Sequence, residues 1–190
     1  EQYGKVDFED IYRLAGEQTV VGHVTASFDH IQDVKAPQEI VLQCIGESLQ
    51  LEQTNKAMNQ FIGKLVEKMR EADIITLLVK GQGIAQCYEK PFWRSSGDVD
   101  LFLSTDNYER AKATLTLMAS DVENEYSSSK HLGMTIDGWI VELHGTLQCN
   151  LSSKVRKGIK EVENNIIYGG QVRSWQNGDV QVFLPSANNS

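Results

Sequence analysis

Cysteine is scarce in this chain of 190 residues, which contains only 3. Cys44, Cys87 and Cys149 are widely separated, and no Cys-x-x-Cys pair occurs. This spacing argues against a zinc ribbon and against a framework of disulfides. Free thiols are typical of a reducing compartment, so we expect a cytoplasmic protein.

Long apolar runs are absent as well. No segment approaches the roughly 18 apolar residues that a membrane-spanning helix needs, so we expect no membrane partner. The first five residues, Glu1 to Lys5, do not resemble a signal peptide. The chain begins without Met and ends at Ser190, so we allow for a piece of a longer protein whose C-terminal part is missing.

Basic charge is also low. The chain has 18 Lys and Arg against 26 Asp and Glu, which gives a net charge of −8. A protein this acidic is poorly suited to neutralising the phosphates of a nucleic acid, so we expect no nucleic-acid partner. With 3 Pro and 41% hydrophobic residues, the composition is typical of a folded globular protein. The length suits one catalytic-sized domain with a helical appendage.

Residues 1–72 are predicted to form a helical N-terminal part. We expect a short helix at residues 7–14 and a weaker one at 19–31, where valines lower the helix propensity. Pro37 suits the first turn of a long helix whose apolar residues recur at steps of three and four. The polar stretch at residues 52–56 either interrupts this helix or forms an exposed turn of it.

Residues 73–190 change character and alternate between strand and helix patterns. We expect strands at residues 74–79, 98–103, 132–136, 139–144, 172–175 and 180–184, and helices at 84–88, 105–118 and 153–165. Asp137-Gly138 and Asn177-Gly178 are typical of tight hairpin turns, and Ser104 or Thr105 suits a helix N-cap. These patterns predict an α/β (α+β) fold.

Asp98 and Asp100 are the first candidates for chemistry. Side chains alternate along a strand, so both carboxylates project from one face while Val99, Leu101 and Leu103 pack on the other. Two like charges at this spacing repel unless a cation lies between them, and Mg²⁺ prefers such oxygen ligands. For the Asp-x-Asp pattern alone, two strand-end aspartates that face water are the simpler interpretation.

Glu142 interrupts a strand that is otherwise apolar, and His144 shares its face. A buried carboxylate needs a partner or a metal ion. If this strand neighbours the Asp98 strand, three carboxylates converge, and three carboxylates can hold two Mg²⁺ ions for an in-line displacement at phosphorus. The alternative is a salt bridge between Glu142 and a nearby Lys or Arg.

Lys80 and Gly81 lie where a strand ends and a helix begins. A helix N-terminus attracts anions, and Gly81 and Gly83 allow a phosphate to approach the backbone. Lys80 adds a positive charge, and Arg94 adds a planar group suited to phosphate. The alternative is a glycine-rich turn with a solvated lysine. The segment is not a Walker A loop, because the Gly-x-x-x-x-Gly-Lys-Ser/Thr pattern is missing.

Together these motifs carry a resemblance to a known family. They are Leu78-Val79-Lys80-Gly81, Arg94-Ser95-Ser96-Gly97-Asp98-Val99-Asp100 and Val141-Glu142-Leu143-His144. The set resembles the DNA polymerase beta-type nucleotidyltransferase superfamily and, more closely, the bacterial group called uncharacterised nucleotidyltransferase. The resemblance covers roughly residues 74–147. Lys-Gly stands where relatives usually carry Gly-Ser, which leaves the usual serine contact to the phosphate open.

The resemblance implies a mixed-sheet nucleotidyltransferase core at residues 73–190, flanked by helices. It implies transfer of a nucleoside monophosphate from a nucleoside triphosphate to an unidentified acceptor, with release of pyrophosphate. The acceptor would be a small molecule, a sugar derivative or a protein hydroxyl. The implied catalytic residues, which would also hold two Mg²⁺ or Mn²⁺ ions, are Asp98, Asp100 and Glu142. The implied phosphate-binding residues are Lys80, Gly81, Arg94, Ser96 and Gly97.

Several alternatives stay open. His144 would orient Glu142 or contact the nucleotide, or it is an ordinary hydrogen-bonded strand residue. His131 is expected in a loop that could approach the site. Phe92 and Trp93 could stack on a base, although packing is favoured. The basic residues of the 153–165 helix are expected to face solvent. The chain as a whole could instead be a non-catalytic nucleotide- or metal-binding module, or a protein-interaction module that docks through its long helix.

Overall fold

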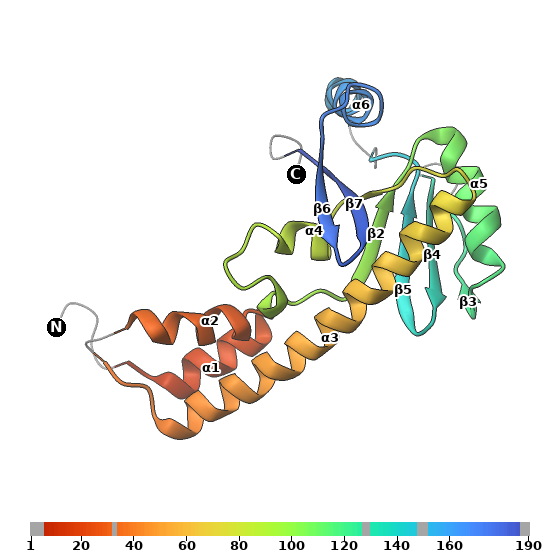
Figure 1. Cartoon of the computed structure of the whole chain (residues 1–190). Coiled ribbons are helices and arrows are strands. Elements are labelled where there is room, and N and C mark those ends of the chain that lie inside the picture. Colours follow the sequence, from red (N-terminus) through yellow and green to blue (C-terminus); the bar gives the residue numbers. More distant parts are fainter. Residues whose placement is uncertain (1–5, 32–33, 127–129, 148–151, 187–190) are drawn as a thin grey trace. The chain divides into compact units, whose positions relative to one another are not determined.

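The structure is a computed structural model, and it describes residues 6–31, 34–126, 130–147 and 152–186. Cys149 and the predicted loop at residues 127–129 lie outside the described residues. The chain has an α/β fold with a seven-stranded mixed sheet (Figure 1). It divides into two compact units: a helical unit of residues 1–57 and 87–96, and a sheet unit of residues 58–86 and 97–190. No helix of the described part of the chain is long and apolar enough to cross a membrane.

The helical unit contains α1 (Phe8–Glu17), α2 (Val21–Ser27), η1 (Phe28–His30), the first part of α3 (Gln38–Glu71) and η2 (Pro91–Trp93). The predicted first helix is confirmed, and the Asp7 side chain caps it by accepting hydrogen bonds from two backbone N–H groups. The predicted helix at 19–31 is wrong in extent. Thr19 adopts a left-handed conformation with φ of 56°, so α2 begins two residues later and ends at Ser27.

Helix α3 runs without interruption from Gln38 to Glu71, so the break considered at residues 52–56 is wrong. Nor is this stretch simply an exposed turn, because Asn55 within it is buried. Its amide donates hydrogen bonds to the carbonyl oxygens of Phe92 at 2.7 Å and Arg94 at 2.8 Å. The polar residue therefore anchors a neighbouring loop within the helical unit instead of interrupting the helix.

The sheet unit has the strand order β3-β4-β5-β2-β1-β7-β6. The strands are β1 (Leu77–Leu78), β2 (Asp98–Phe102), β3 (Asp121–Val122), β4 (His131–Ile136), β5 (Trp139–His144), β6 (Val172–Asn177) and β7 (Val180–Pro185). Strand β1 covers only two residues of the predicted 74–79, and β3 was not predicted. The β6–β7 turn lies one residue later than predicted, at Gly178 and Asp179, because Asn177 still pairs with Val180.

The helices of the sheet unit are the second part of α3, α4 (Gly81–Ala85), α5 (Thr105–Thr116) and α6 (Ser153–Ile167). The predicted Ser104 cap is confirmed, since its hydroxyl accepts a hydrogen bond from the Asn107 N–H at 3.3 Å. Helix α4 begins three residues before the predicted 84–88 helix. Its first residue, Gly81, has a left-handed φ of 44°, which glycine adopts without strain.

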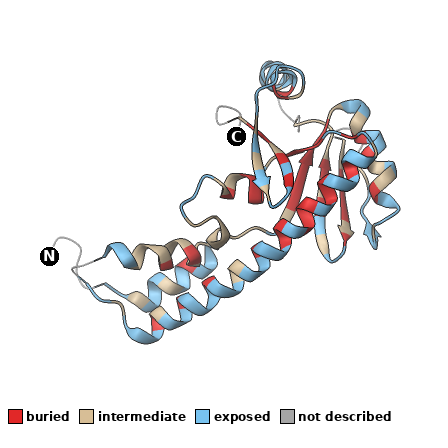
Figure 2. Ribbon diagram, in the orientation of Figure 1, coloured by how far each residue is buried: buried red, intermediate tan, exposed pale blue. Residues whose placement is uncertain are grey.

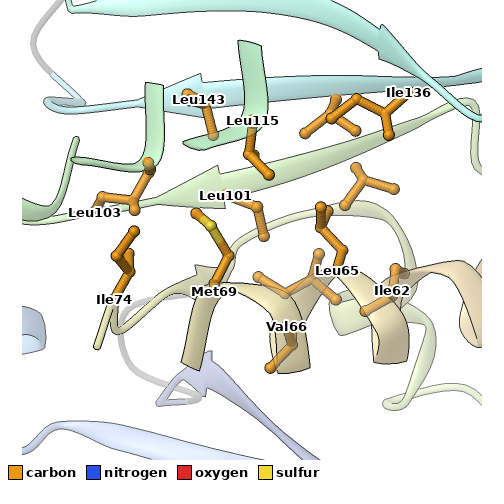
Figure 3. Close-up of a cluster of buried hydrophobic side chains, with 14 of the residues drawn as sticks. Ile62, Leu65, Val66, Met69, Ile74, Leu101, Leu103, Leu115, Ile136 and Leu143 are labelled. Atoms are coloured by element: carbon orange, nitrogen blue, oxygen red, sulfur yellow. The ribbon is translucent and has the colours of Figure 1, made fainter. Parts of the chain in front are cut away.

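The core of the sheet unit covers one face of the sheet with apolar side chains and leaves the polar residues on the other face. Side chains of α3, α5 and alternate strand residues form one large apolar cluster, which includes Val99, Leu101 and Leu103 as predicted (Figure 3). On the other face, Phe102 packs with Leu77 and Ile166 in a smaller cluster. Figure 2 shows the central strands as buried and most of α6 as exposed. The polar residues of β2 and β5 project from the face opposite α3.

Candidate functional site

The pairing of β2 with β5 brings the three predicted carboxylates together. These strands are parallel neighbours, and Asp100 is the register partner of Glu142. Oxygen atoms of Asp98, Asp100 and Glu142, the acidic trio, all lie within 4.8 Å of one another. Adjacent strands lie about 4.8 Å apart, so the closeness of Asp100 and Glu142 follows from their register. Asp98 joins them because it lies two residues before Asp100 on the same face of β2.

Asp100 is the most enclosed member of the acidic trio, with a side chain that is 0% exposed. Its Oδ1 lies 2.7 Å from Lys80 Nζ and 2.8 Å from His144 Nε2. Burial raises the pKa of Asp100, but hydrogen bonds from His144 and Lys80 outweigh burial and hold that pKa below its ordinary value. Its Oδ2 is buried and has no hydrogen-bond partner among the described residues. The site therefore holds an ionised carboxylate with one oxygen left unsatisfied.

Asp98 has the opposite perturbation. Burial raises its pKa, and the negative charges of Asp100 and Glu142 raise it further. A cation placed among these carboxylates would relieve the repulsion and satisfy the orphaned Oδ2 of Asp100. The donors are all carboxylate oxygens, which are the ligands that Mg²⁺ prefers. The residues present therefore fit a divalent cation such as Mg²⁺ or Mn²⁺.

Lys80 lies two residues after the end of β1 and is held beside Asp100 by the backbone, since the Val79 N–H donates to the Asp100 carbonyl oxygen at 3.1 Å. Partial burial lowers the pKa of Lys80, but the hydrogen bond to Asp100 and its charge raise it more, so the ammonium stays protonated. The interpretation of Lys80 as a merely solvated residue is wrong. The side chain is 58% exposed and ion-paired at its tip.

The two glycines near Lys80 have different structural roles. Gly81 adopts the left-handed backbone conformation that starts α4. A Cβ atom on Gly83 would lie 2.9 Å from Leu184 Cδ2 and 3.2 Å from the Leu78 carbonyl oxygen. Gly83 therefore allows α4 to pack closely against β1 and β7, and this packing accounts for the glycine without a phosphate.

Glu142 pairs with histidines, so the interpretation as a salt bridge to Lys or Arg is wrong for the described residues. Its Oε2 lies 3.2 Å from His131 Nε2 and 3.4 Å from His144 Nε2. His131 was expected in a loop, but it is the first residue of β4 and the register partner of His144. The hairpin thus adds a second histidine to the sheet face that carries the acidic trio.

Arg94 and Ser96 belong to the helical unit, and the acidic trio belongs to the sheet unit. Arg94 donates hydrogen bonds from Nη1 to the Ser96 hydroxyl at 3.0 Å and to the Ser95 carbonyl oxygen at 3.1 Å. Gly97 directly precedes β2, and a Cβ atom there would have nothing within 4 Å. A phosphate-binding role for these three predicted residues stays a prediction.

Two further expectations concern packing and solvation. Trp93 packs within the helical unit, where its indole N–H donates to Glu52 at 3.1 Å and the Lys90 ammonium lies 4.2 Å from its ring centroid. This supports the packing interpretation over base stacking. The basic residues of α6 are exposed, as expected for a solvated face; they are Lys154, Arg156, Lys157 and Lys160.

Comparison with known proteins gives a family match and a structural match. A family model described as "Uncharacterised nucleotidyltransferase" matches residues 4–177. Among solved structures, the chain is similar to one described as "a putative nucleotidyltransferase" from Thermotoga maritima, with 12% identity and a TM-score of 0.52. That match covers 68% of this chain and 77% of the other, and at this identity it shows the fold alone. No protein with a curated description matches the chain.

Proposed function

Because the chain belongs to the uncharacterised nucleotidyltransferase family, we propose that it transfers a nucleoside monophosphate from a nucleoside triphosphate to an acceptor hydroxyl. The observation that carries the proposal is the acidic trio, whose oxygens lie within 4.8 Å of one another on two adjacent strands. The acceptor class comprises small molecules, sugar derivatives and protein hydroxyls.

The proposed reaction is an in-line displacement at the α-phosphorus. The acceptor oxygen forms a new bond to that phosphorus and gives up its proton to solvent. The bond from the α-phosphorus to the oxygen that bridges to the β-phosphate breaks, and pyrophosphate leaves with the electron pair. Catalysis of this kind depends on positioning the reactants and on stabilising the developing charge.

The acidic trio would hold two Mg²⁺ ions, or Mn²⁺ in their place. Such ions, when bound, neutralise triphosphate charge and make the acceptor hydroxyl easier to deprotonate. The carboxylates of Asp98, Asp100 and Glu142 position the reacting groups. Lys80 neutralises Asp100 and, in this proposal, turns its ammonium toward the incoming triphosphate. His144 orients two of the carboxylates, since its Nε2 lies 2.8 Å from Asp100 and 3.4 Å from Glu142.

Thermal melting tests the nucleotide site without knowledge of the acceptor. The protein is melted with ATP, GTP, CTP and UTP in turn, each with and without Mg²⁺. A ligand that binds the folded state raises Tm by mass action. We expect a Mg²⁺-dependent rise with at least one triphosphate, lost in Asp98→Asn. The exposed turn variant Asp137→Asn is the matched control and should keep the rise. No rise with any triphosphate would contradict the proposal.

Turnover is tested with Glu142→Gln and a triphosphate labelled at the α-phosphate. The native chain should release pyrophosphate and move the label to an acceptor supplied from a metabolite pool or to protein. Glu142→Gln should reduce this by about 100-fold or more, while Glu67→Gln on the exposed side of α3 should not. If Glu142→Gln alters only nucleotide affinity and no label moves with the native chain, the protein is a binding module.

A further inference from the structure

A second set of metal-ligating side chains lies beside the acidic trio and contains two nitrogen donors. Ligand atoms of His131, Glu142 and His144 all lie within 4.8 Å of one another. The residues come from the β4–β5 hairpin, where His131 and His144 are register partners. Their ring centroids are 4.9 Å apart. Only Glu142 is shared with the acidic trio.

The two nitrogen–oxygen distances within this set match the spacing of ligands around one small metal ion. His131 Nε2 and His144 Nε2 lie 3.2 Å and 3.4 Å from the same oxygen, Glu142 Oε2. Two ligands of a tetrahedral ion with bonds of about 2.0–2.1 Å are separated by about 3.3 Å. Both histidine nitrogens therefore already lie at coordination spacing from Glu142 Oε2, and all three donor atoms lie within 4.8 Å of one another.

One close contact within this set is not bridged by a hydrogen bond. Three nitrogen–oxygen contacts share two Nε2 atoms: His131 to Glu142, His144 to Glu142, and His144 to Asp100. A neutral or charged imidazole carries at most one proton on Nε2. The proton of His144 Nε2 serves the shorter 2.8 Å contact with Asp100, so the 3.4 Å contact with Glu142 lacks a proton. A cation between the rings and Glu142 would supply the missing attraction.

The donor chemistry identifies the class of ion. Imidazole nitrogen suits zinc, cobalt, nickel and other borderline transition metals, whereas Mg²⁺ prefers oxygen ligands. Two histidines and one glutamate also match a ligand set that proteins use for Zn²⁺ with one position left open. We propose that His131, Glu142 and His144 form a binding site for a divalent transition-metal ion of the Zn²⁺ and Co²⁺ class, selective against Mg²⁺. Each Nε2 is deprotonated when it binds the ion, so His144 Nε2 gives up its hydrogen bond to Asp100, and each neutral ring keeps its proton on Nδ1.

Equilibrium dialysis of the full chain against Zn²⁺, in a large excess of Mg²⁺, tests the site without any nucleotide. We expect one Zn²⁺ per chain, with affinity reduced at least about tenfold in His131→Asn. Asp98→Asn removes an acidic-trio residue that is not in this set and should keep the affinity. His30→Asn, which removes an exposed histidine of the helical unit, is the matched control and should also keep it.

Co²⁺ provides a second measurement that reports on the ligands themselves. The visible absorption bands of Co²⁺ bound to the native chain should indicate nitrogen ligands. These bands should be lost in His131→Asn. His131→Gln repeats the test, and an unchanged Tm without metal shows that either variant is folded. Equal Zn²⁺ affinity in His131→Asn and the native chain would overturn the proposal. The proposal would also be overturned if only Asp98→Asn lost Zn²⁺ affinity, if the native chain bound no Zn²⁺, or if Mg²⁺ displaced the bound Zn²⁺. None of these results depends on nucleotidyl transfer.

Discussion

Lys80 Nζ lies 2.7 Å from Asp100 Oδ1, so a cation of the chain itself pairs with the most buried carboxylate of the site. The two side chains differ sharply in exposure, at 58% for Lys80 and 0% for Asp100. The ammonium can therefore leave toward solvent or a ligand, while the carboxylate cannot move away. In the proposed function, Lys80 competes with a divalent ion for Asp100 until a triphosphate offers the ammonium another partner.

Lys80→Met tests this competition. When the Lys80 ammonium is removed, Asp100 keeps only the hydrogen bond with His144. We therefore expect the free energy of unfolding to fall by about 1–2 kcal/mol. Mg²⁺ alone should then raise Tm more in the variant than in the native chain, because no lysine has to be displaced. Triphosphates should raise Tm less. Lys157→Met, at an exposed position of α6, should leave all three values unchanged. A smaller response to Mg²⁺ in Lys80→Met would contradict the competition.

The pKa of Asp98 makes a prediction about stability and pH. Burial and the charges of Asp100 and Glu142 raise this pKa, so the ionised form is disfavoured in the folded state. The contribution of Asp98 to stability is thus fully present below its ordinary pKa of about 3.9 and is lost as pH rises through the raised value. At neutral pH and without metal, Asp98→Asn should therefore raise the free energy of unfolding.

The measurement for Asp98→Asn is denaturant unfolding across pH, with and without Mg²⁺. The gain over the native chain should shrink as pH falls through the raised pKa of Asp98, and it should vanish below the ordinary pKa of about 3.9, where the carboxyl is protonated in both states. Added Mg²⁺ should stabilise the native chain and reverse the difference. Asp137→Asn, at an exposed hairpin turn, should show neither effect. A gain that persists unchanged in acid would mean that charge repulsion is not its cause.

Strand alternation and turn chemistry made the acidic face predictable from sequence. The period of two places Asp98 and Asp100 on one face, and a two-residue turn at residues 137 and 138 fixes the hairpin. The same hairpin could have revealed His131, since His131 and His144 each lie five residues from the strand ends that flank the turn. What the sequence alone could not supply is the parallel pairing of β2 with β5, because long-range strand neighbours are set by tertiary packing.

Other differences arise where tertiary contacts override a local pattern. The apolar run at 74–79 resembles a full strand, but only Leu77 and Leu78 find ladder partners in β2 and β7. Asn55 belongs to a polar stretch that resembles a helix break. The helix continues through it, and the Asn55 amide donates hydrogen bonds to two carbonyl groups that are distant in sequence. In both cases the sequence indicates whether the residues are apolar or polar, but it does not indicate which distant groups they contact.

Close packing around Gly83 predicts a loss of stability on adding a single methyl group. In Gly83→Ala the new Cβ would meet Leu184 and the Leu78 backbone, so we expect a loss of about 1–3 kcal/mol in the free energy of unfolding. Gly46→Ala is the matched control, since it lies in α3 with nothing within 4 Å of the added atom. That variant should gain up to about 1 kcal/mol from helix propensity. Equal effects in the two variants would show that packing of α4 is not tight.

The last prediction concerns Asn55, which connects α3 to the loop that carries Arg94. Asn55→Ala removes both hydrogen bonds to the loop carbonyl groups, at 2.7 Å and 2.8 Å, and leaves these acceptors without that donor. We expect a loss of about 1–3 kcal/mol in the free energy of unfolding and faster amide exchange at residues 91–96. If Arg94 and Ser96 bind phosphate, as the family resemblance predicts, triphosphate affinity falls as well. Gln53→Ala, an exposed change on the same helix, should alter none of these. Faster exchange with unchanged triphosphate affinity would remove Arg94 and Ser96 from the proposed site while leaving the acidic trio in place.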